Sequence, residues 1–177
     1  VLKHYRRGGW AARISSDRYL FHGAGSSRSH NEFRLLTRLR ILGLPVPKPM
    51  AAFCLSQYGL CRAALLTHYI PNAQSLVEAV AKRNAPWTAV GDALAGFHKA
   101  FVRHADLNAN NILIEADQSV NFIDWDKGRI ENNATGWSEG VLARLIRSLR
   151  KEASNADLEY LESGIDALSK AYRGSMT

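Results

Sequence analysis

Residues 102–128 read VRHADLNANNILIEADQSVNFIDWDKG and set three polar side chains, Asp106, Asn111 and Asp124, beside strongly apolar segments. Burying an unpaired carboxylate costs free energy, so soluble proteins normally keep such groups away from apolar surroundings. The usual exception is a carboxylate that binds a metal ion or a positively charged ligand. The stretch therefore indicates a binding or catalytic site.

The segments between these polar residues predict a hairpin that brings them together. NILIE and VNFID have the apolar character of short buried strands, and ADQS joins them. A hairpin of these strands would return Asp124 to the vicinity of Asp106 and Asn111. His104, Asp106 and Asn111 also fit the form H-x-D-x-x-x-x-N, which in kinases carries residues for phosphate transfer. We expect His104 itself to be a scaffold residue that forms hydrogen bonds near this loop.

The three side chains suit phosphate transfer from ATP. An attacking alcohol must release a proton, and the carboxylate of Asp106 is the candidate catalytic base. Mg²⁺ screens the phosphates of ATP and prefers oxygen ligands, which Asn111 and Asp124 supply. We therefore predict a kinase with ATP and Mg²⁺ as cofactors. A structural alternative, in which these side chains only form turns, accounts less well for the joint pattern.

Two upstream residues are candidates for holding the nucleotide. Lys3, in the predicted strand VLKHY, suits the strand lysine that contacts ATP phosphates, and Glu32, in a helix predicted over residues 27–43, suits its glutamate partner. Alternatives stay open for both. Ser29 and Glu32 have the spacing of a helix capping box, and a solvated Lys3 also fits. The glycine-rich loop of a kinase would precede Lys3, so we expect the N-terminal part to be incomplete here.

The order of predicted elements indicates an α+β fold with two parts. Residues 1–70 hold the first strands and one helix, including a hairpin formed by MAAFCLS and LCRAALLTHYI. Residues 71–177 are mostly helical, with a long helix over residues 85–102 and two more after Gly136. This order matches a protein-kinase-like bilobal fold, with a small β-rich N-lobe over residues 1–70 and a C-lobe over residues 71–177.

Charge and composition limit the kinds of partner that we expect. The net charge of +7 favours anionic partners such as nucleotide phosphates, acidic sugars or anionic lipid surfaces. The basic residues accompany no recognised nucleic-acid motif, so we expect no nucleic-acid partner, and nothing in the sequence implies a protein partner. Two cysteines, Cys54 and Cys61, have neither metal-binding nor disulfide-framework spacing, and we expect both to be reduced cytosolic thiols.

Several features argue against a protein kinase. Ala105 stands where protein kinases often have an arginine, and Asn108 replaces their lysine. DWD replaces D-F-G, no A-P-E follows, and only 53 residues remain after Asp124. That length leaves little room for an activation segment and a peptide-docking lobe. A kinase of small molecules or sugars is the more economical interpretation.

Seven segments together resemble one particular group of sugar kinases: LKHYRRGG, DRYLFHG, EFRLL, GLPVPKPMAA, HADLNANNIL, FIDWDKGR and RLIRSL. They are similar to the 3-deoxy-D-manno-octulosonic acid (Kdo) kinase family of bacterial lipopolysaccharide inner-core assembly. The resemblance runs from Val1 to about Lys151. One departure bears on Glu32. The family often has an arginine where Lys3 stands, so phosphate contact by Lys3 is the firmer expectation and its pairing with Glu32 the weaker one.

The resemblance implies a substrate and a location. Members of the family use ATP to phosphorylate the 4-hydroxyl of a Kdo residue attached to a lipid A precursor. They work at the cytoplasmic face of the inner membrane of Gram-negative bacteria. The implied partner is therefore a lipid-linked acidic sugar, Kdo–lipid A, and the implied localisation is cytoplasmic and peripheral to the membrane.

Because the implied acceptor is acidic, we considered further charged side chains as candidates for contacting it. Arginine binds carboxylates and phosphates well, and YRRGG places Arg6 and Arg7 beside a flexible glycine pair. Both are candidates for binding the substrate, although a solvated basic turn fits equally. Asp126, the last residue of DWD, is a candidate for orienting substrate groups or approaching a second metal.

A helix near the C-terminus carries a basic stripe of Arg144, Arg147 and Arg150, opposite apolar residues. Such a stripe can contact an anionic membrane surface, and more often it is the solvated side of a core helix. Two other functions stay open: a related kinase that acts on a heptose or another small molecule, and a non-catalytic pseudokinase. The retained Asp106, Asn111 and Asp124 argue against the pseudokinase.

Overall fold

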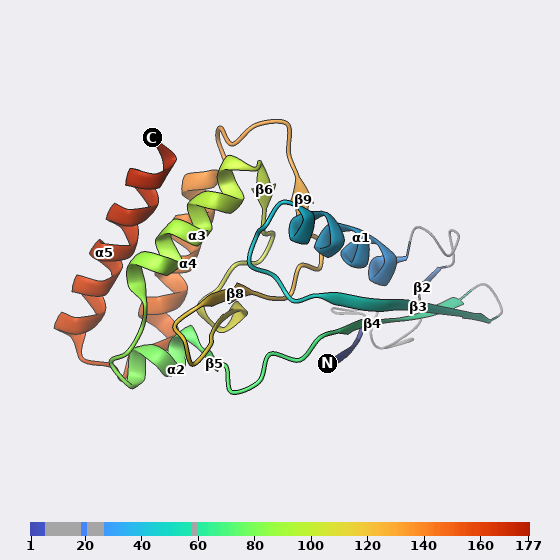
Figure 1. Ribbon diagram of the computed structural model, residues 1–177, viewed down its shortest axis with the longest axis horizontal. Coiled ribbons are helices and arrows are strands. Elements are labelled where there is room, and N and C mark those ends of the chain that lie inside the picture. The colour runs from blue at the N-terminus through green and yellow to red at the C-terminus, as the bar shows by residue number, and fades with distance from the viewer. Residues whose placement is uncertain (6–18, 21–26, 58–59) are drawn as a thin grey trace.

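The structure, a computed structural model, describes residues 1–5, 19–20, 27–57 and 60–177, with side chains not described at 19–20, 56–57 and 60–61. Arg6 and Arg7 lie outside the described residues, so their expected role stays a prediction. The first sheet and one helix lie at one end of the molecule and the other helices at the opposite end, with the site-bearing segments between them (Figure 1). This is the expected α+β order.

Strand β4 (Leu60–Thr67) is the hub of the first sheet. It pairs antiparallel with β1 (Leu2–His4), β2 (Tyr19–Leu20) and β3 (Pro49–Gln57), and the β3–β4 pair is the expected hairpin. Helix α1 (Arg28–Ile41) packs on β3 and β4, as Figure 1 shows. We interpret this sheet and helix as the N-lobe, and its boundary at residue 70 stays a prediction.

The start of α1 differs from the expected capping box. Ser27 is the N-cap, and its hydroxyl accepts a hydrogen bond from the backbone N–H of His30 at 3.4 Å. Ser29 is buried inside the helix and donates a hydrogen bond to the carbonyl of Phe53 at 2.8 Å. The alternative prediction of a capping box formed by Ser29 and Glu32 was therefore wrong. Two serines compete for the cap, and contact with β3 decides between them because it draws Ser29 inward.

The end of α1 follows the expected pattern. Gly43 adopts a φ of +72°, a left-handed conformation that glycine enters without steric cost. Its N–H donates to the carbonyl of Arg40, and the N–H of Leu44 donates to the carbonyl of Leu39, both at 3.0 Å. These two bonds form a Schellman motif, which ends the helix before the segment that leads into β3.

The remaining elements form small sheets and a group of helices: β5 (Gln74–Ser75), α2 (Leu76–Ala81), α3 (Trp87–Lys99), β6 (Val102–Arg103), η3 (Ala109–Asn111), β7 (Ile112–Ile114), β8 (Val120–Phe122), β9 (Arg129–Ile130), α4 (Ser138–Glu152) and α5 (Leu158–Met176). The β7–β8 pair is the expected hairpin, and β5 extends its sheet. The β6–β9 pair was not expected from the sequence. No helix within the described ranges is long and apolar enough to cross a membrane.

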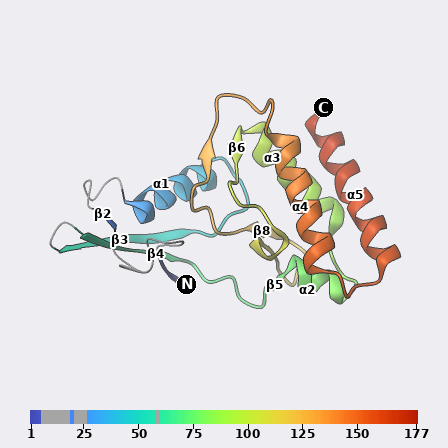
Figure 2. The same ribbon diagram turned by 180° about the vertical axis from the view of Figure 1, so that it is seen from behind.

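Helices α3 and α5 pack side by side in both views (Figures 1 and 2). Two glycines permit this close approach. A Cβ atom at Gly164 would lie 2.0 Å from a ring carbon of Trp87, and one at Gly91 would lie 2.3 Å from the carbonyl oxygen of Leu168. The helix pair supports one continuous core that extends through Phe97 and other buried residues toward the first sheet.

Cys54, in β3, departs from the expectation of a reduced thiol. It is disulfide-bonded in the structure. The sequence holds two cysteines, and the β3–β4 hairpin brings the strands that carry them side by side. The spacing of the cysteines does not reveal a strand register, so the disulfide could not be predicted from their positions in the chain.

The completely buried His98 of α3 predicts a dependence of stability on pH. Its Nδ1 lies 2.8 Å from the hydroxyl of Tyr172, and burial lowers the pKa of His98 to about 4. In the unfolded chain the imidazole of His98 takes up a proton with a pKa of about 6.5, whereas in the folded protein it stays neutral until a lower pH. We therefore expect the free energy of unfolding to fall as the pH decreases from about 6.5 toward 4, by ~3 kcal/mol from this residue in total.

Urea unfolding at steps across this range measures the effect. His98→Gln supplies the comparison, because glutamine can still accept a hydrogen bond from Tyr172 and does not titrate. The variant should be less stable than the wild type near neutral pH, and its stability should fall less steeply on acidification. Parallel stability curves for the two proteins would contradict the assignment to His98.

Candidate active site

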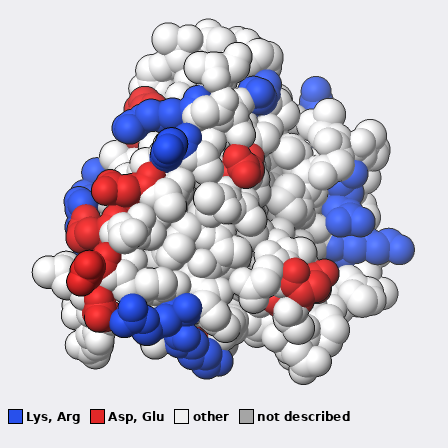
Figure 3. Space-filling model, turned by 60° about the vertical axis from the view of Figure 1, so that its left-hand side comes forward, with Lys and Arg blue, Asp and Glu red and all other residues white. Residues whose placement is uncertain are grey.

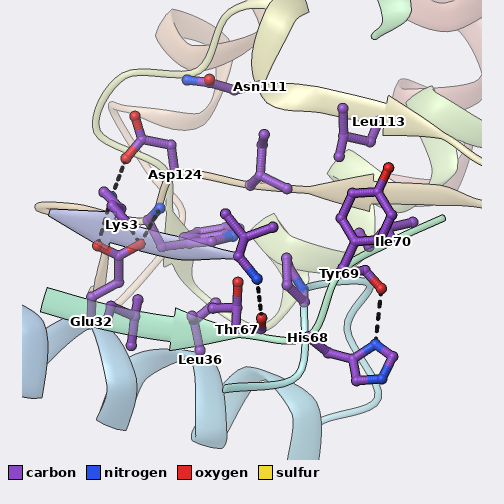
Figure 4. A pocket seen from close by; sticks show the side chains of 15 residues that line it. Lys3, Glu32, Leu36, Thr67, His68, Tyr69, Ile70, Asn111, Leu113 and Asp124 are labelled. Atoms are coloured by element: carbon purple, nitrogen blue, oxygen red, sulfur yellow. Dashed lines mark hydrogen bonds and ion pairs between the residues drawn. The ribbon is translucent and has the colours of Figure 1, made fainter. Parts of the chain in front are cut away.

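A pocket of about 410 Å³ opens between the first sheet and the β7–β8 hairpin. Figure 4 shows the Lys3–Glu32 pair, Asn111 and Asp124 toward one end of it, and Tyr69 and Ile70 toward the other. One end therefore carries charge and hydrogen-bonding groups, and the other is mainly apolar. Its walls are formed by Val1, Lys3, Glu32, Leu36, Pro47, Leu65, Thr67, His68, Tyr69, Ile70, Asn111, Leu113, Ile123, Asp124 and Trp125.

The ammonium of Lys3 joins three elements at the charged end of the pocket. Lys3, on β1, donates to the two carboxylate oxygens of Glu32 on α1 at 3.1 and 2.8 Å. It also lies 2.5 Å from Oδ1 of Asp124, just after β8. The sequence-predicted Lys3, Glu32 and Asp124 are thus brought together, although 121 residues separate the first from the last.

Glu32 is 4% exposed, so its charge depends on protein partners. Besides Lys3, it accepts a hydrogen bond from the hydroxyl of Tyr5 at 2.5 Å and one from the backbone N–H of Trp125 at 3.1 Å. Burial, together with this hydrogen bond to Glu32, raises the pKa of Tyr5 far above its usual range, so the phenol stays protonated and remains a donor. Glu32 is therefore held on three sides and fixes Lys3 in turn.

Asp124 has a backbone φ of +61°, in the left-handed region that few residues other than glycine enter. Aspartate and asparagine are tolerated there better than most residues. The next residue, Trp125, is buried, packs against Phe97 and His104, and donates its indole N–H to the carbonyl of Phe122 at 2.9 Å. Because the tryptophan anchors the turn, the chain can present Asp124 to the pocket.

His104 couples the loop that carries Asp106 to the strand that leads to Asp124. Its Nδ1 accepts a hydrogen bond from the backbone N–H of Asp106 at 3.2 Å, so the other nitrogen, Nε2, donates to the carbonyl of Ile123 at 3.0 Å. Burial lowers the pKa of His104, so the ring is neutral, as these two bonds require. His104 is therefore a scaffold residue, as expected.

Two asparagine side chains hold the backbone of Asp106. The amides of Asn108 and Asn111 donate to the carbonyl oxygen of Asp106 at 3.1 and 3.2 Å. Because the nitrogen of the Asn111 amide is used in this way, its oxygen is left to serve as a ligand in the pocket. The sequence motif predicted that Asp106 and Asn111 act together, and the structure brings them into direct contact.

The donor set of this pocket fits Mg²⁺ bound together with a nucleotide. Asn111 and Asp124 offer one amide oxygen and one carboxylate, which are hard oxygen ligands. The part of the chain that the structure describes holds no group of three or more His, Cys, Asp or Glu side chains suited to a metal ion. Mg²⁺ commonly binds through one or two protein ligands plus phosphates and water, so two ligands suffice here.

Arg144 is the site residue that sequence reasoning missed. The carboxylate of Asp106 is 72% exposed and forms an ion pair with the guanidinium of Arg144 on α4. Helical periodicity shows only that Arg144 faces away from the apolar side of α4, and gives no direction toward Asp106. In the same stripe, Arg150 pairs with both carboxylate oxygens of Glu162 at 2.9 and 2.7 Å.

The expected basic stripe is therefore not a row of unpaired cations. Arg144 and Arg150 both bind carboxylates of this chain, which weakens the case for a membrane-binding role. Figure 3, which brings the helical end forward, shows basic and acidic side chains in neighbouring groups, with uncharged surface between them. The membrane contact of α4 stays a prediction.

Asp126 has a partner of its own. Its carboxylate pairs with the guanidinium of Arg28, at the start of α1, through a bidentate contact. Both residues line a second pocket of about 360 Å³, next to the first and sharing Glu32 and Trp125 with it. Asp126 thus joins the turn after β8 to α1, and its expected role toward substrate or metal stays a prediction.

Comparison with known proteins identifies the family and relatives of this chain. The chain matches the Lipopolysaccharide kinase (Kdo/WaaP) family over residues 1–172. It is 48% identical over 175 residues to a 3-deoxy-D-manno-octulosonic acid kinase of Xanthomonas campestris pv. campestris (strain B100), covering 97% of this chain and 70% of that protein. A protein of the same name from Stenotrophomonas maltophilia (strain R551-3) is 45% identical over 174 residues, with the same coverage.

A solved structure supports the fold. The crystal structure of an aminoglycoside-3'-phosphotransferase of type VIII superposes with a TM-score of 0.58, at 14% sequence identity, over 81% of this chain and 72% of the other. The expected kinase-like α+β fold is thereby confirmed. The family matches residues 1–172, and the Xanthomonas campestris relative is 48% identical over 175 residues. The chain therefore belongs to the lipopolysaccharide kinase (Kdo/WaaP) family.

Proposed function

We propose that this protein transfers the terminal phosphate of ATP to a hydroxyl of Kdo in lipopolysaccharide inner-core biosynthesis, at the 4-hydroxyl of Kdo on a lipid A precursor. The observation that carries the proposal is the convergence of four polar residues on one pocket, with Asp106 held beside it by the amide of Asn111; the four are Lys3, Glu32, Asn111 and Asp124. These are the groups that phosphate transfer needs, and the chain is 48% identical to a Kdo kinase.

The two ends of the pocket suit the two parts of ATP. Apolar side chains such as Leu36, Leu65 and Leu113 offer surfaces for an adenine ring. At the other end, the ammonium of Lys3 is held by Glu32 and reaches the position where phosphates would lie. In this assignment Lys3 binds phosphate and Glu32 fixes the lysine, because a buried and multiply bonded carboxylate is a rigid anchor.

In the proposed reaction, Asp106 acts on the acceptor. Its exposed carboxylate accepts the proton of the attacking sugar hydroxyl, while the oxygen of that hydroxyl forms a bond to the terminal phosphorus of ATP. The bond from that phosphorus to the bridging oxygen breaks, and ADP leaves. When bound, Mg²⁺ would neutralise phosphate charge, and Asn111 and Asp124 would hold it. Positioning by His104 and the asparagine amides keeps Asp106 in place.

A lipid-linked acceptor implies where the enzyme works. We propose that the protein acts at the cytoplasmic face of the inner membrane, as a peripheral protein. The net charge of +7 is favourable toward an anionic lipid surface, because a positively charged protein is attracted to it.

Mass spectrometry of a Kdo–lipid A acceptor, incubated with the protein, ATP and Mg²⁺, tests the proposal directly. We expect the acceptor to gain the mass of one phosphate, and fragmentation to place that phosphate on Kdo. Phosphate found only on a heptose, or on an aminoglycoside offered in parallel, would favour a related kinase with another acceptor. Nucleotide binding without any transfer would favour a pseudokinase.

A further inference from the structure

The ion pair between Arg144 and Asp106 occupies the carboxylate that the proposed reaction uses as its base. It joins the proposed catalytic carboxylate to a cation from α4, a helix that contributes no residue to the lining of the nucleotide pocket. Both side chains are exposed, at 49% for Arg144 and 72% for Asp106. Exposed ion pairs contribute little to folding stability and exchange readily for other partners. The pair is therefore suited to a change of partner when substrate binds.

The backbone that carries Arg144 is fixed, unlike its side-chain contact. The neighbouring Leu142 and Leu145 are buried in the core. One turn further along α4, the hydroxyl of Ser148 accepts a hydrogen bond from the backbone N–H of Ala109 at 2.9 Å, which ties the helix to the loop after Asp106. The guanidinium therefore stays within reach of the reacting hydroxyl wherever its own partner lies.

Two other cations near the site, among the residues that the structure describes, pair with carboxylates that are not the proposed base. Lys3 bridges Glu32 and Asp124, and Arg28 pairs with Asp126. Arg144 differs because its partner is the exposed carboxylate that must contact the acceptor. While an oxygen of the Asp106 carboxylate accepts a hydrogen bond from the guanidinium, the acceptor hydroxyl cannot donate to it at the same position. An incoming anion can resolve this competition by taking over the guanidinium.

We propose that Arg144 binds the carboxylate of the acidic acceptor sugar and, by doing so, releases Asp106 to accept the hydrogen bond of the reacting hydroxyl. The inference rests on the proposed function, since it concerns the acceptor of that reaction. A planar guanidinium matches a carboxylate through two parallel hydrogen bonds, which is the geometry an acidic sugar would use. A neutral sugar would leave Arg144 on Asp106, so the same contact selects acidic acceptors.

Kinetics with a matched pair of acceptors test this role. The pair is a soluble Kdo glycoside and the same glycoside with its carboxyl group converted to the primary amide. We expect the wild type to prefer the acid by about 10- to 100-fold in kcat/KM, the range of a charge-assisted hydrogen bond. Arg144→Gln should reduce this preference to a few-fold, mainly by raising KM for the acid, and transfer to the amide should rise because Asp106 no longer pairs with Arg144. Arg144→Lys should recover only part of the preference.

Arg150→Gln is the matched control, because Arg150 lies on the same helix, is 55% exposed and pairs with a carboxylate outside the site. It should leave the preference for the acid unchanged. Thermal melting checks that each variant is folded. Equal losses toward acid and amide in Arg144→Gln would overturn the proposal, since Arg144 would then serve Asp106 or the transferred phosphate instead.

A binding measurement separates this inference from the proposed function. Calorimetry with the Kdo glycoside, without nucleotide, should show weaker binding to Arg144→Gln than to the wild type, and no such difference for the amide. If the wild type transfers phosphate to neither acceptor but shows this binding difference, the proposed reaction fails and the binding of the sugar carboxylate by Arg144 stands. If transfer to the acid is efficient and binding is the same in both proteins, the role of Arg144 fails alone.

Discussion

Asp106→Asn is expected to reduce phosphate transfer by about 10³-fold without unfolding the protein. Asparagine has nearly the same shape as aspartate but cannot take up the proton of the attacking hydroxyl. The loop should keep its conformation, because His104, Asn108 and Asn111 all bind the backbone of residue 106 and not its side chain. The ion pair with Arg144 is lost, but it is exposed and contributes little to stability.

Transfer rates and melting temperatures of the wild type and the variant provide the measurement. Asp117→Asn is a suitable control, since Asp117 is exposed in the β7–β8 turn and accepts a hydrogen bond from the backbone N–H of Ser119, which asparagine can replace. It should behave as the wild type. If Asp106→Asn kept transfer within about tenfold of the wild type, Asp106 would not be the base.

Asp124→Asn is expected to have the second large effect, with transfer also reduced by about 10³-fold. The variant lacks the carboxylate proposed to hold Mg²⁺ and to pair with Lys3. Asparagine is the informative replacement because it tolerates the left-handed φ of +61° at this position, whereas alanine would add backbone strain. A loss of function can then be assigned to the missing charge.

The readout that separates metal binding from general damage is thermal stabilisation by nucleotide. A ligand that binds only the folded state raises the melting temperature, so ATP with Mg²⁺ should stabilise the wild type more than ATP with EDTA. In Asp124→Asn this benefit of Mg²⁺ should disappear, while Asp117→Asn should retain it. A variant that kept the full Mg²⁺-dependent shift would exclude Asp124 as a metal ligand.

Local patterns in the chain were sufficient for much of the fold. The apolar character of NILIE and VNFID predicted the β7–β8 hairpin, and Gly43 marked the end of α1. These features depend on neighbours within a few residues, so short-range rules apply to them. The short β6–β9 pair was missed because two-residue strands lack a period and exist only through a partner far along the chain.

The contacts that organise the site join residues far apart in the sequence, and only some of them were predicted. Glu32 was expected either as a capping residue or as the partner of Lys3. The structure selects contact with Lys3, Tyr5 and Trp125, because burial of α1 against the sheet turns this side chain inward. The bidentate pair of Asp126 with Arg28 had no signal in the sequence, since 98 residues separate the two.

The sequence by itself determined the chemistry available to this protein. The motif from His104 to Asn111, followed at fixed distance by Asp124, allowed a kinase to be proposed because a short hairpin has few ways to fold. Only the tertiary structure decided which charges meet: that Lys3 bridges Glu32 and Asp124, and that Arg144 reaches Asp106. The physical reason is that an ion pair depends on distance in space, and the packing of α1 and α4 sets that distance independently of spacing along the chain.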